Sequence, residues 1–333
     1  MELDIYDEEN IKALAEKLDY LPIALQQAAI CIRELKFQTI SPYEHYLQKY
    51  RQIERKFVVF DDRVLRTIFT VYDITLDVMK KEEGAEAAKE ILNVLSYFGS
   101  EPISTEILEG MMYGEQLMKS ATDVLEKYSL IKLGVSTLSV DELLQKLIRY
   151  NLTKQKNEEK VVLKSALKLF CNPEIISKNL VHALSVWDHS QKYITLIIYI
   201  FPVSMYIVHD LVKCARYDKA YLFIGKLQSL LTNLSGDEAK CYELVTKYHV
   251  GKIYLCQKKY EEALSIFDEV LNNPKSGHPL CLEVKLSKGH ALHWLERCDE
   301  AIKFYQEVYD VRKVEDGENN DKTLFIKQCM EAC

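Results

Sequence analysis

The chain has 333 residues and is 48% hydrophobic and 28% charged, which suits two or three folded modules and excludes a disordered tail as the nature of the whole chain. It contains only 11 glycines and 7 prolines, where ordinary usage would give roughly 23 and 17, so helices are expected in place of a turn-rich sandwich, barrel or propeller. The formal net charge of −7 disfavours a dedicated binder of nucleic acid or of anionic membranes.

The segment 1–55 is expected to form helices. Ile11, Leu14 and Leu18 recur with the spacing of an amphipathic helix. Pro22 then suits the first turn of a second helix, where a missing N–H costs nothing. The stretch 51–61 changes from charged to apolar and is expected to connect this segment to the next.

Residues 62–155 predict a winged-helix-like domain, which consists of helices and one small hairpin. Helical periodicity runs through 62–118, and Ser104 is expected to cap a helix within that range. Residues 129–140 alternate, are rich in β-branched side chains and contain Gly134, which is the pattern of a β-hairpin. This hairpin is the only β-structure that we expect.

The stretch 193–208 carries no charged residue. A membrane-spanning helix needs about 20 apolar residues, and Pro202 interrupts this shorter run. We therefore expect a pair of buried helices that breaks at Pro202.

The nine cysteines are scattered along the chain without a Cys-x-x-Cys pair. Residues 1–4, Met-Glu-Leu-Asp, are acidic, so no signal sequence is expected there. Both features favour buried or free thiols in a reducing compartment. We therefore expect a cytoplasmic location.

Residues 160–333 predict a helical solenoid, because a similar tetrad recurs in them at the intervals typical of helical repeats. The tetrads are Tyr217-Asp218-Lys219-Ala220, Tyr260-Glu261-Glu262-Ala263 and Cys298-Asp299-Glu300-Ala301. Three pairs keep the interval between the second and third tetrads: Gly251 with Gly289, Ala263 with Ala301, and Phe267 with Tyr305. Small residues let paired helices approach, and the aromatic ring fills the next gap. This pattern gives two good repeats and one degenerate repeat.

The repeat resembles the tetratricopeptide family. In the clearest copy, that family's Leu-Gly, Tyr, Ala, Phe and Pro positions correspond to Val250-Gly251, Tyr254, Ala263, Phe267 and Pro274. The next copy has Leu292 in place of the Tyr, and the copy containing Ala220 has Val208 in place of the Gly. The longer loops and the segment 317–324 look like the kinesin-light-chain type of repeat, which carries His-Pro where this chain has Asn320-Asp321.

Two segments of the first half resemble the NB-ARC signalling NTPases. Residues 18–28, Leu-Asp-Tyr-Leu-Pro-Ile-Ala-Leu-Gln-Gln-Ala, are similar to that family's Gly-Leu-Pro-Leu-Ala-Leu segment. Residues 138–145, Leu-Ser-Val-Asp-Glu-Leu-Leu-Gln, are similar to the wing-to-helix segment of its winged-helix subdomain. With the repeats, the resemblance implies the C-terminal part of an NB-ARC–tetratricopeptide protein, in which residues 1–55 resemble the end of the NB-ARC module.

The resemblance does not extend to nucleotide hydrolysis. The sequence has no Gly-x-x-x-x-Gly-Lys-Ser/Thr loop to hold phosphates. Asp141 stands where the wing of that family carries a His that meets the nucleotide phosphate. The sequence also lacks a Gly-x-Ser-x-Gly elbow, His-Glu-x-x-His and Gly-x-Gly-x-x-Gly. We therefore expect neither an enzyme nor a bound cofactor.

A winged-helix unit raises the possibility of DNA binding. Its recognition helix, expected at 141–150, carries Asp141, Glu142, Lys146 and Arg149 and so has no net positive charge. A helix that enters a DNA groove is normally basic. We therefore expect no nucleic-acid partner.

Several side chains of the metal-ligand types lie at 278–298, namely His278, Cys281, His290, His293 and Cys298. The repeat already accounts for the packing from Gly289 to Ala301. We therefore predict groove lining or plain helix surface in preference to a metal, and metal binding by this set stays open.

In the tetratricopeptide register, the residues that face the concave groove are Tyr248, Lys252, His290 and His293. A lysine and two histidines beside a tyrosine would hold an acidic side chain or a C-terminal carboxylate of a peptide. The plainer alternative is that Lys252 is merely solvated.

The leading hypothesis is therefore a non-enzymatic interaction or scaffold protein that binds a protein or peptide partner through residues 160–333. We expect neither nucleic acid nor membrane as a partner. The alternative is a fragment of a nucleotide-dependent signalling switch whose ATPase part lies upstream. The sequence names neither the partner nor the oligomeric state.

Overall fold

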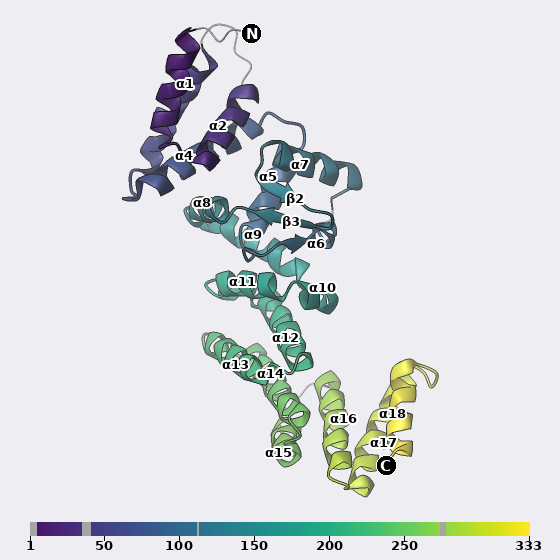
Figure 1. Ribbon diagram of the computed structural model, residues 1–333. Coiled ribbons are helices and arrows are strands. Elements are labelled where there is room, and N and C mark those ends of the chain that lie inside the picture. Colours follow the sequence, from purple (N-terminus) through teal and green to yellow (C-terminus); the bar gives the residue numbers. More distant parts are fainter. Residues whose placement is uncertain (1–4, 35–40, 112, 274–277) are drawn as a thin grey trace. The chain divides into compact units, whose positions relative to one another are not determined.

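The computed structural model describes residues 5–34, 41–111, 113–273 and 278–333 (Figure 1). These residues are mainly helical, as the sequence predicts, and they contain one small antiparallel sheet of three strands.

The chain divides into two compact units, Met1–Ser190 and Gln191–Cys333. The expected boundaries at 55–62 and 155–160 both lie inside the first unit. The N-terminal helices and the winged-helix-like segment therefore belong to one compact unit.

The helices of the first unit are α1 (Ile5–Lys17), α2 (Pro22–Glu34), α3 (Pro42–Glu54), η1 (Arg55–Phe57), α4 (Arg63–Met79), α5 (Ala85–Leu95), α6 (Glu106–Glu109), α7 (Glu115–Lys127), α8 (Glu142–Thr153), α9 (Lys156–Leu169), α10 (Pro173–Lys178) and α11 (Leu180–Ser190). Its strands are β1 (Ile103–Ser104), β2 (Ile131–Leu133) and β3 (Thr137–Val140). Pro22 is the first residue of α2, as expected. The expected connector 51–61 instead begins inside α3 and continues through η1.

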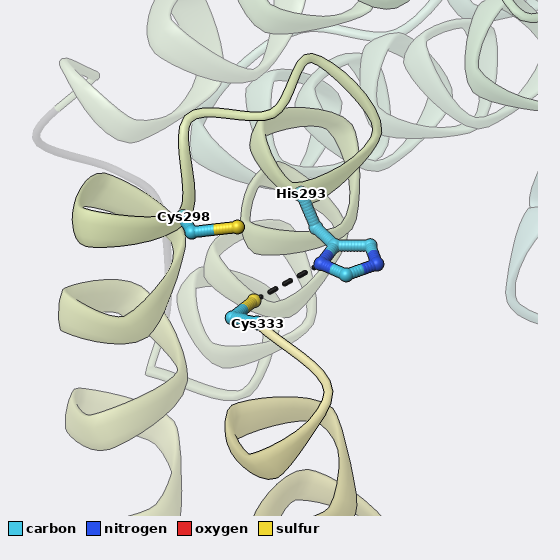
Figure 2. Close-up of side chains that lie close together, drawn as sticks. All are labelled: His293, Cys298 and Cys333. Atoms are coloured by element: carbon cyan, nitrogen blue, oxygen red, sulfur yellow. Dashed lines mark hydrogen bonds between the residues drawn. The ribbon is translucent and has the colours of Figure 1, made fainter.

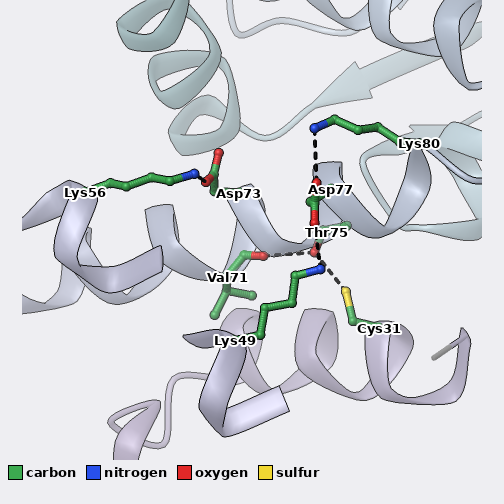
Figure 3. A network of polar contacts seen from close by, with 8 residues as sticks. All are labelled: Cys31, Lys49, Lys56, Val71, Asp73, Thr75, Asp77 and Lys80. Atoms are coloured by element: carbon green, nitrogen blue, oxygen red, sulfur yellow. Dashed lines mark hydrogen bonds and ion pairs between the residues drawn. The ribbon is translucent and has the colours of Figure 1, made fainter. Parts of the chain in front are cut away.

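A polar network joins α2, α3 and α4 within the first unit (Figure 3). The Thr75 hydroxyl donates to the Val71 carbonyl at 3.0 Å and lies 3.3 Å from the Cys31 sulfur. Beside them, Lys49 of α3 pairs with Asp77 of α4 at 2.7 Å. Burial raises the pKa of Cys31 to about 11, so this thiol stays protonated at neutral pH and serves the packing of the helices.

The sheet has the strand order β1-β3-β2, and both strand pairs are antiparallel. Strands β2 and β3 form the predicted hairpin, in which Ile131 pairs with Val140. Strand β1 was not predicted from the sequence. The prediction that Ser104 caps a helix is wrong, because Ser104 pairs with Thr137 in the sheet. Pairing with β1 satisfies backbone groups along the second edge of β3 and buries Ile103.

The carboxylate of Asp141 caps the N-terminus of α8. It accepts hydrogen bonds from the N–H groups of Leu143 at 2.9 Å and Leu144 at 3.2 Å. These donors have no partner inside the helix. Asp141→Ala should therefore lower the free energy of unfolding by about 1 kcal/mol, measured by urea denaturation, whereas Asp141→Asn should retain most of the stability. An unchanged urea midpoint for Asp141→Ala would contradict the capping role.

The helices of the second unit are η2 (Ile194–Leu196), α12 (Ile197–Lys213), α13 (Tyr217–Leu231), α14 (Asp237–Cys256), α15 (Tyr260–Leu271), α16 (His278–Trp294), α17 (Cys298–Glu315) and α18 (Asp321–Glu331). The expected break at Pro202 does not occur, because α12 continues through this residue. Pro202 is the sixth residue of α12, so its ring costs one backbone hydrogen bond close to the helix start. Burial of the neighbouring Ile200, Phe201 and Val203 favours the continuous helix.

The segment Ile194–Lys213 is long and apolar enough to cross a membrane by length and composition alone. However, 61% of its most apolar stretch is buried inside the structure. This burial favours the core helix of a soluble protein, as the sequence analysis expected for this run.

The second unit contains three helical hairpins that are built alike. The three tetrads found in the sequence are the first four residues of α13, α15 and α17. Two positions before each tetrad, Ala215, Lys258 and Glu296 have positive φ angles of 55°, 62° and 61°. The residue that follows each of them donates its N–H to the carbonyl five positions earlier, at 2.8, 2.9 and 3.0 Å. The degenerate copy therefore makes the same helix-ending turn as the two clear copies.

The predicted approach of helices at glycine is present in two of the hairpins. A Cβ atom on Gly251 would lie 2.5 Å from the ring of Phe267, and one on Gly289 would lie 2.5 Å from the ring of Tyr305. Both rings are buried against the glycine backbone. Glycine is thus required at these positions because a side chain would collide with the neighbouring ring, and not because of the backbone angles.

The third hairpin fills the same space differently. Val208 and Ile224 stand at the positions of the glycine and the aromatic residue, and both are buried. A larger residue on one helix accompanies a smaller residue on the other, as close packing requires. Compared with the two clear copies, the degenerate copy therefore has a larger side chain on its first helix and a smaller side chain on its second helix.

The other repeat positions also lie in the core. Ala220, Ala263 and Ala301 are fully buried, and Tyr254 is half-buried. Pro274 lies outside the described residues. At the start of α18, the side chain of Asn320 accepts a hydrogen bond from the N–H of Lys322 at 2.9 Å.

Candidate functional site

Three basic side chains share one register position on the first helices of the three hairpins of the second unit. His209 lies on α12, Lys252 on α14 and His290 on α16, and their spacing along the chain equals that of the three tetrads. Burial, and then the charge of Lys252, lower the pKa of His209. The pKa of His290 is also lowered, by burial and by the charges of His293 and Lys252. We call His209, Lys252 and His290 the basic row.

A fourth basic side chain, His249, lies one helical turn from Lys252 on α14. Burial, with smaller effects of Lys252 and His209, lowers the pKa of His249 to about 3. The imidazole rings are therefore mostly uncharged at neutral pH, whereas Lys252 is charged. Lys252 makes no ion pair within the part of the chain that the structure describes, so its charge is available to a ligand.

Tyr248, which was predicted to face the groove, belongs to the core. It is 7% exposed, and its hydroxyl lies 3.2 Å from that of Ser287 on α16. Its ring packs against Phe267, while the ammonium group of Lys252 lies 5.7 Å from the ring centroid. The buried Tyr248 ring therefore packs close to the ammonium group of Lys252 and offers little surface to a ligand.

The two predicted histidines of α16 contact the last helix. The Nε2 atom of His290 lies 3.7 Å from the sulfur of Cys329, and the Nδ1 atom of His293 lies 3.0 Å from the sulfur of Cys333. The ring of His290 also contacts the ring of Phe325 of α18. The charge of Lys252 acts on His290, whereas His293 takes part in a separate group of side chains.

That group contains two of the five metal-ligand side chains noted at 278–298. His293 and Cys298 come together with Cys333, and their ligand atoms lie within 4.8 Å of one another (Figure 2). Cys281 lies near the start of α16 and His293 near its end, so the two are about 18 Å apart along the helix axis. The side chain of His278 lies outside the described residues.

The basic side chains of the predicted recognition helix, which is now α8, are engaged within the protein. Lys146 pairs with Glu142 at 2.9 Å, and the Arg149 guanidinium donates to the carbonyl of Ser96. These contacts do not favour a role of α8 in DNA binding.

No protein-family model matches the chain, and no curated protein sequence matches it.

Proposed function

We propose that the protein is a non-enzymatic interaction protein whose second unit binds a carboxylate-bearing segment of a protein partner along the basic row. The observation that carries this proposal is the position of Lys252. It is charged, and it lacks an ion-pair partner among the described residues. The same register position holds a histidine on α12 and on α16.

A carboxylate is the group that this arrangement favours. It would form a charge-assisted hydrogen bond with the Lys252 ammonium group, which is stronger than a bond between neutral groups. A bound negative charge would also raise the pKa of His209 and His290 and so favour their protonation. The two imidazoles could then donate to the same ligand, which spreads recognition over three helices.

The repeat architecture supports a protein as the source of that carboxylate. Stacked helical hairpins present an extended surface on which a peptide can contact several repeats. The basic row follows this surface with one residue per repeat.

Selection from a random peptide library displayed on phage would test the proposal with the full chain. The intact protein should enrich peptides that carry Asp, Glu or a free terminal carboxylate. Lys252→Glu should lose this enrichment and bind the enriched peptides at least about tenfold more weakly, which is about 1.4 kcal/mol.

Lys240→Glu is the matched control, because Lys240 is an exposed lysine on the same helix outside the basic row. This variant should enrich the same acidic peptides as the unmodified protein. Equal enrichment by all three proteins, or enrichment without acidic groups, would contradict the proposal.

A further inference from the structure

We propose that His293, Cys298 and Cys333 form a Zn²⁺ site that fastens α18 to the hairpin of α16 and α17. The Nδ1 atom of His293 and the two sulfur atoms lie within 4.8 Å of one another. Figure 2 shows the two sulfur atoms directed toward the same side of the imidazole ring.

The fold brings together three helix ends to make this group. His293 lies in the last turn of α16, Cys298 is the first residue of α17, and Cys333 follows the end of α18. The tight turn at Glu296, whose φ is 61°, joins the first two helices and holds His293 near Cys298. Cys333 is distant from His293 in the sequence and reaches it only because α18 packs against α17.

The donor set fits Zn²⁺ in its chemistry and its size. Zinc binds thiolate sulfur and imidazole nitrogen at about 2.3 and 2.0–2.1 Å, so the ligand atoms of a tetrahedral site lie about 3.5–3.8 Å apart. The Nδ1–Sγ separation of 3.0 Å between His293 and Cys333 is slightly shorter than this value, and no two of the three ligand atoms are more than 4.8 Å apart. Small side-chain rotations would therefore complete the site, with water as the fourth ligand.

The surroundings suit a cation that is bound but accessible. All three side chains are half-buried, so an ion can reach them from solvent. Partial burial, and then the neighbouring Cys298 and Cys329, raise the pKa of Cys333. Zinc would replace the two thiol protons, because both cysteines bind as thiolates. Each ion bound at neutral pH therefore releases about two protons.

Titration of the reduced, metal-free full chain with Co²⁺ would test the site, because tetrahedral cobalt gives visible ligand-field bands and thiolate charge-transfer bands. We expect one Co²⁺ per chain, displacement by Zn²⁺, and a higher melting temperature with zinc. Cys298→Ser and Cys333→Ser should each weaken Co²⁺ binding by at least about tenfold, since each removes one thiolate ligand.

Two further variants separate ligand loss from misfolding. Cys256→Ser removes an exposed thiol elsewhere in the second unit and should bind Co²⁺ as the unmodified protein does. His293→Cys replaces one ligand by another and should retain binding with stronger charge-transfer bands, while far-UV circular dichroism reports folding. Absence of the bands in the reduced protein, or equal binding by Cys256→Ser, Cys298→Ser and Cys333→Ser, would overturn the proposal.

Discussion

Phe267→Ala is expected to lower the free energy of unfolding by about 3–5 kcal/mol, because it removes a fully buried ring and leaves a cavity. The ring lies between α15 and the backbone of α14 at Gly251. Urea denaturation followed by circular dichroism would measure the loss. Phe304→Ala is the control, because Phe304 is only half-buried in the same unit and should lose much less stability.

A double-mutant cycle would show whether the ring and the glycine act as one contact. Gly251→Ala alone should destabilise the protein by about 1–3 kcal/mol, because the new methyl group would collide with the ring of Phe267. In the Phe267→Ala background the methyl group has space, so its cost should largely disappear.

Gly225→Ala on α13 is the matched control for the cycle. A Cβ atom at Gly225 would meet no other atom within 4 Å, so this change should stabilise the helix by about 0.5–1 kcal/mol. Strict additivity of Gly251→Ala and Phe267→Ala would contradict the account of the repeat.

Acid should destabilise the second unit through His249. Burial lowers the pKa of His249 to about 3 in the folded protein, whereas an unfolded histidine has a pKa of about 6.5. Below pH 6.5 the unfolded state therefore binds more protons, and stability falls as the pH falls. Between pH 6.5 and 5, this one group should account for a loss of about 2 kcal/mol. The lowered pKa values of His209 and His290 act in the same direction.

His249→Gln tests this pH dependence, because glutamine is polar but does not titrate. Urea unfolding at pH 7, 6 and 5 should show a shallower loss of stability in the variant than in the unmodified protein. Other ionisable groups are common to both proteins, so their contributions cancel. Parallel pH profiles for the two proteins would contradict the assignment of the effect to His249.

The features that could be predicted from the sequence depend on local spacing. The helical class, the hairpin at Gly134 and the glycine–aromatic contacts of the repeats follow from residues whose partners lie a fixed number of positions away. The strand at Ile103–Ser104 could not be predicted in this way, because its partner β3 follows only after two helices and another strand. The continuity of α12 through Pro202 likewise depends on the core around it.

Only part of the candidate site could be predicted, because only part of it depends on local spacing. Lys252 and His290 were predicted from the tetratricopeptide register, but His209 was missed because its copy has Val208 in place of the glycine. The interval between the first two tetrads would have pointed to His209. Cys333 had no such signal, since its approach to His293 depends on the packing of α18.

Exchanging the charges of Lys252 and of a bound acidic peptide tests the central proposal most directly. An acidic peptide enriched by the full chain, and the same peptide with its acidic residues changed to lysine, would be titrated by fluorescence anisotropy. The unmodified protein should bind the acidic peptide more tightly, and Lys252→Glu should bind the lysine peptide more tightly. If the acidic peptide binds both proteins with the same affinity, a carboxylate site at Lys252 is contradicted.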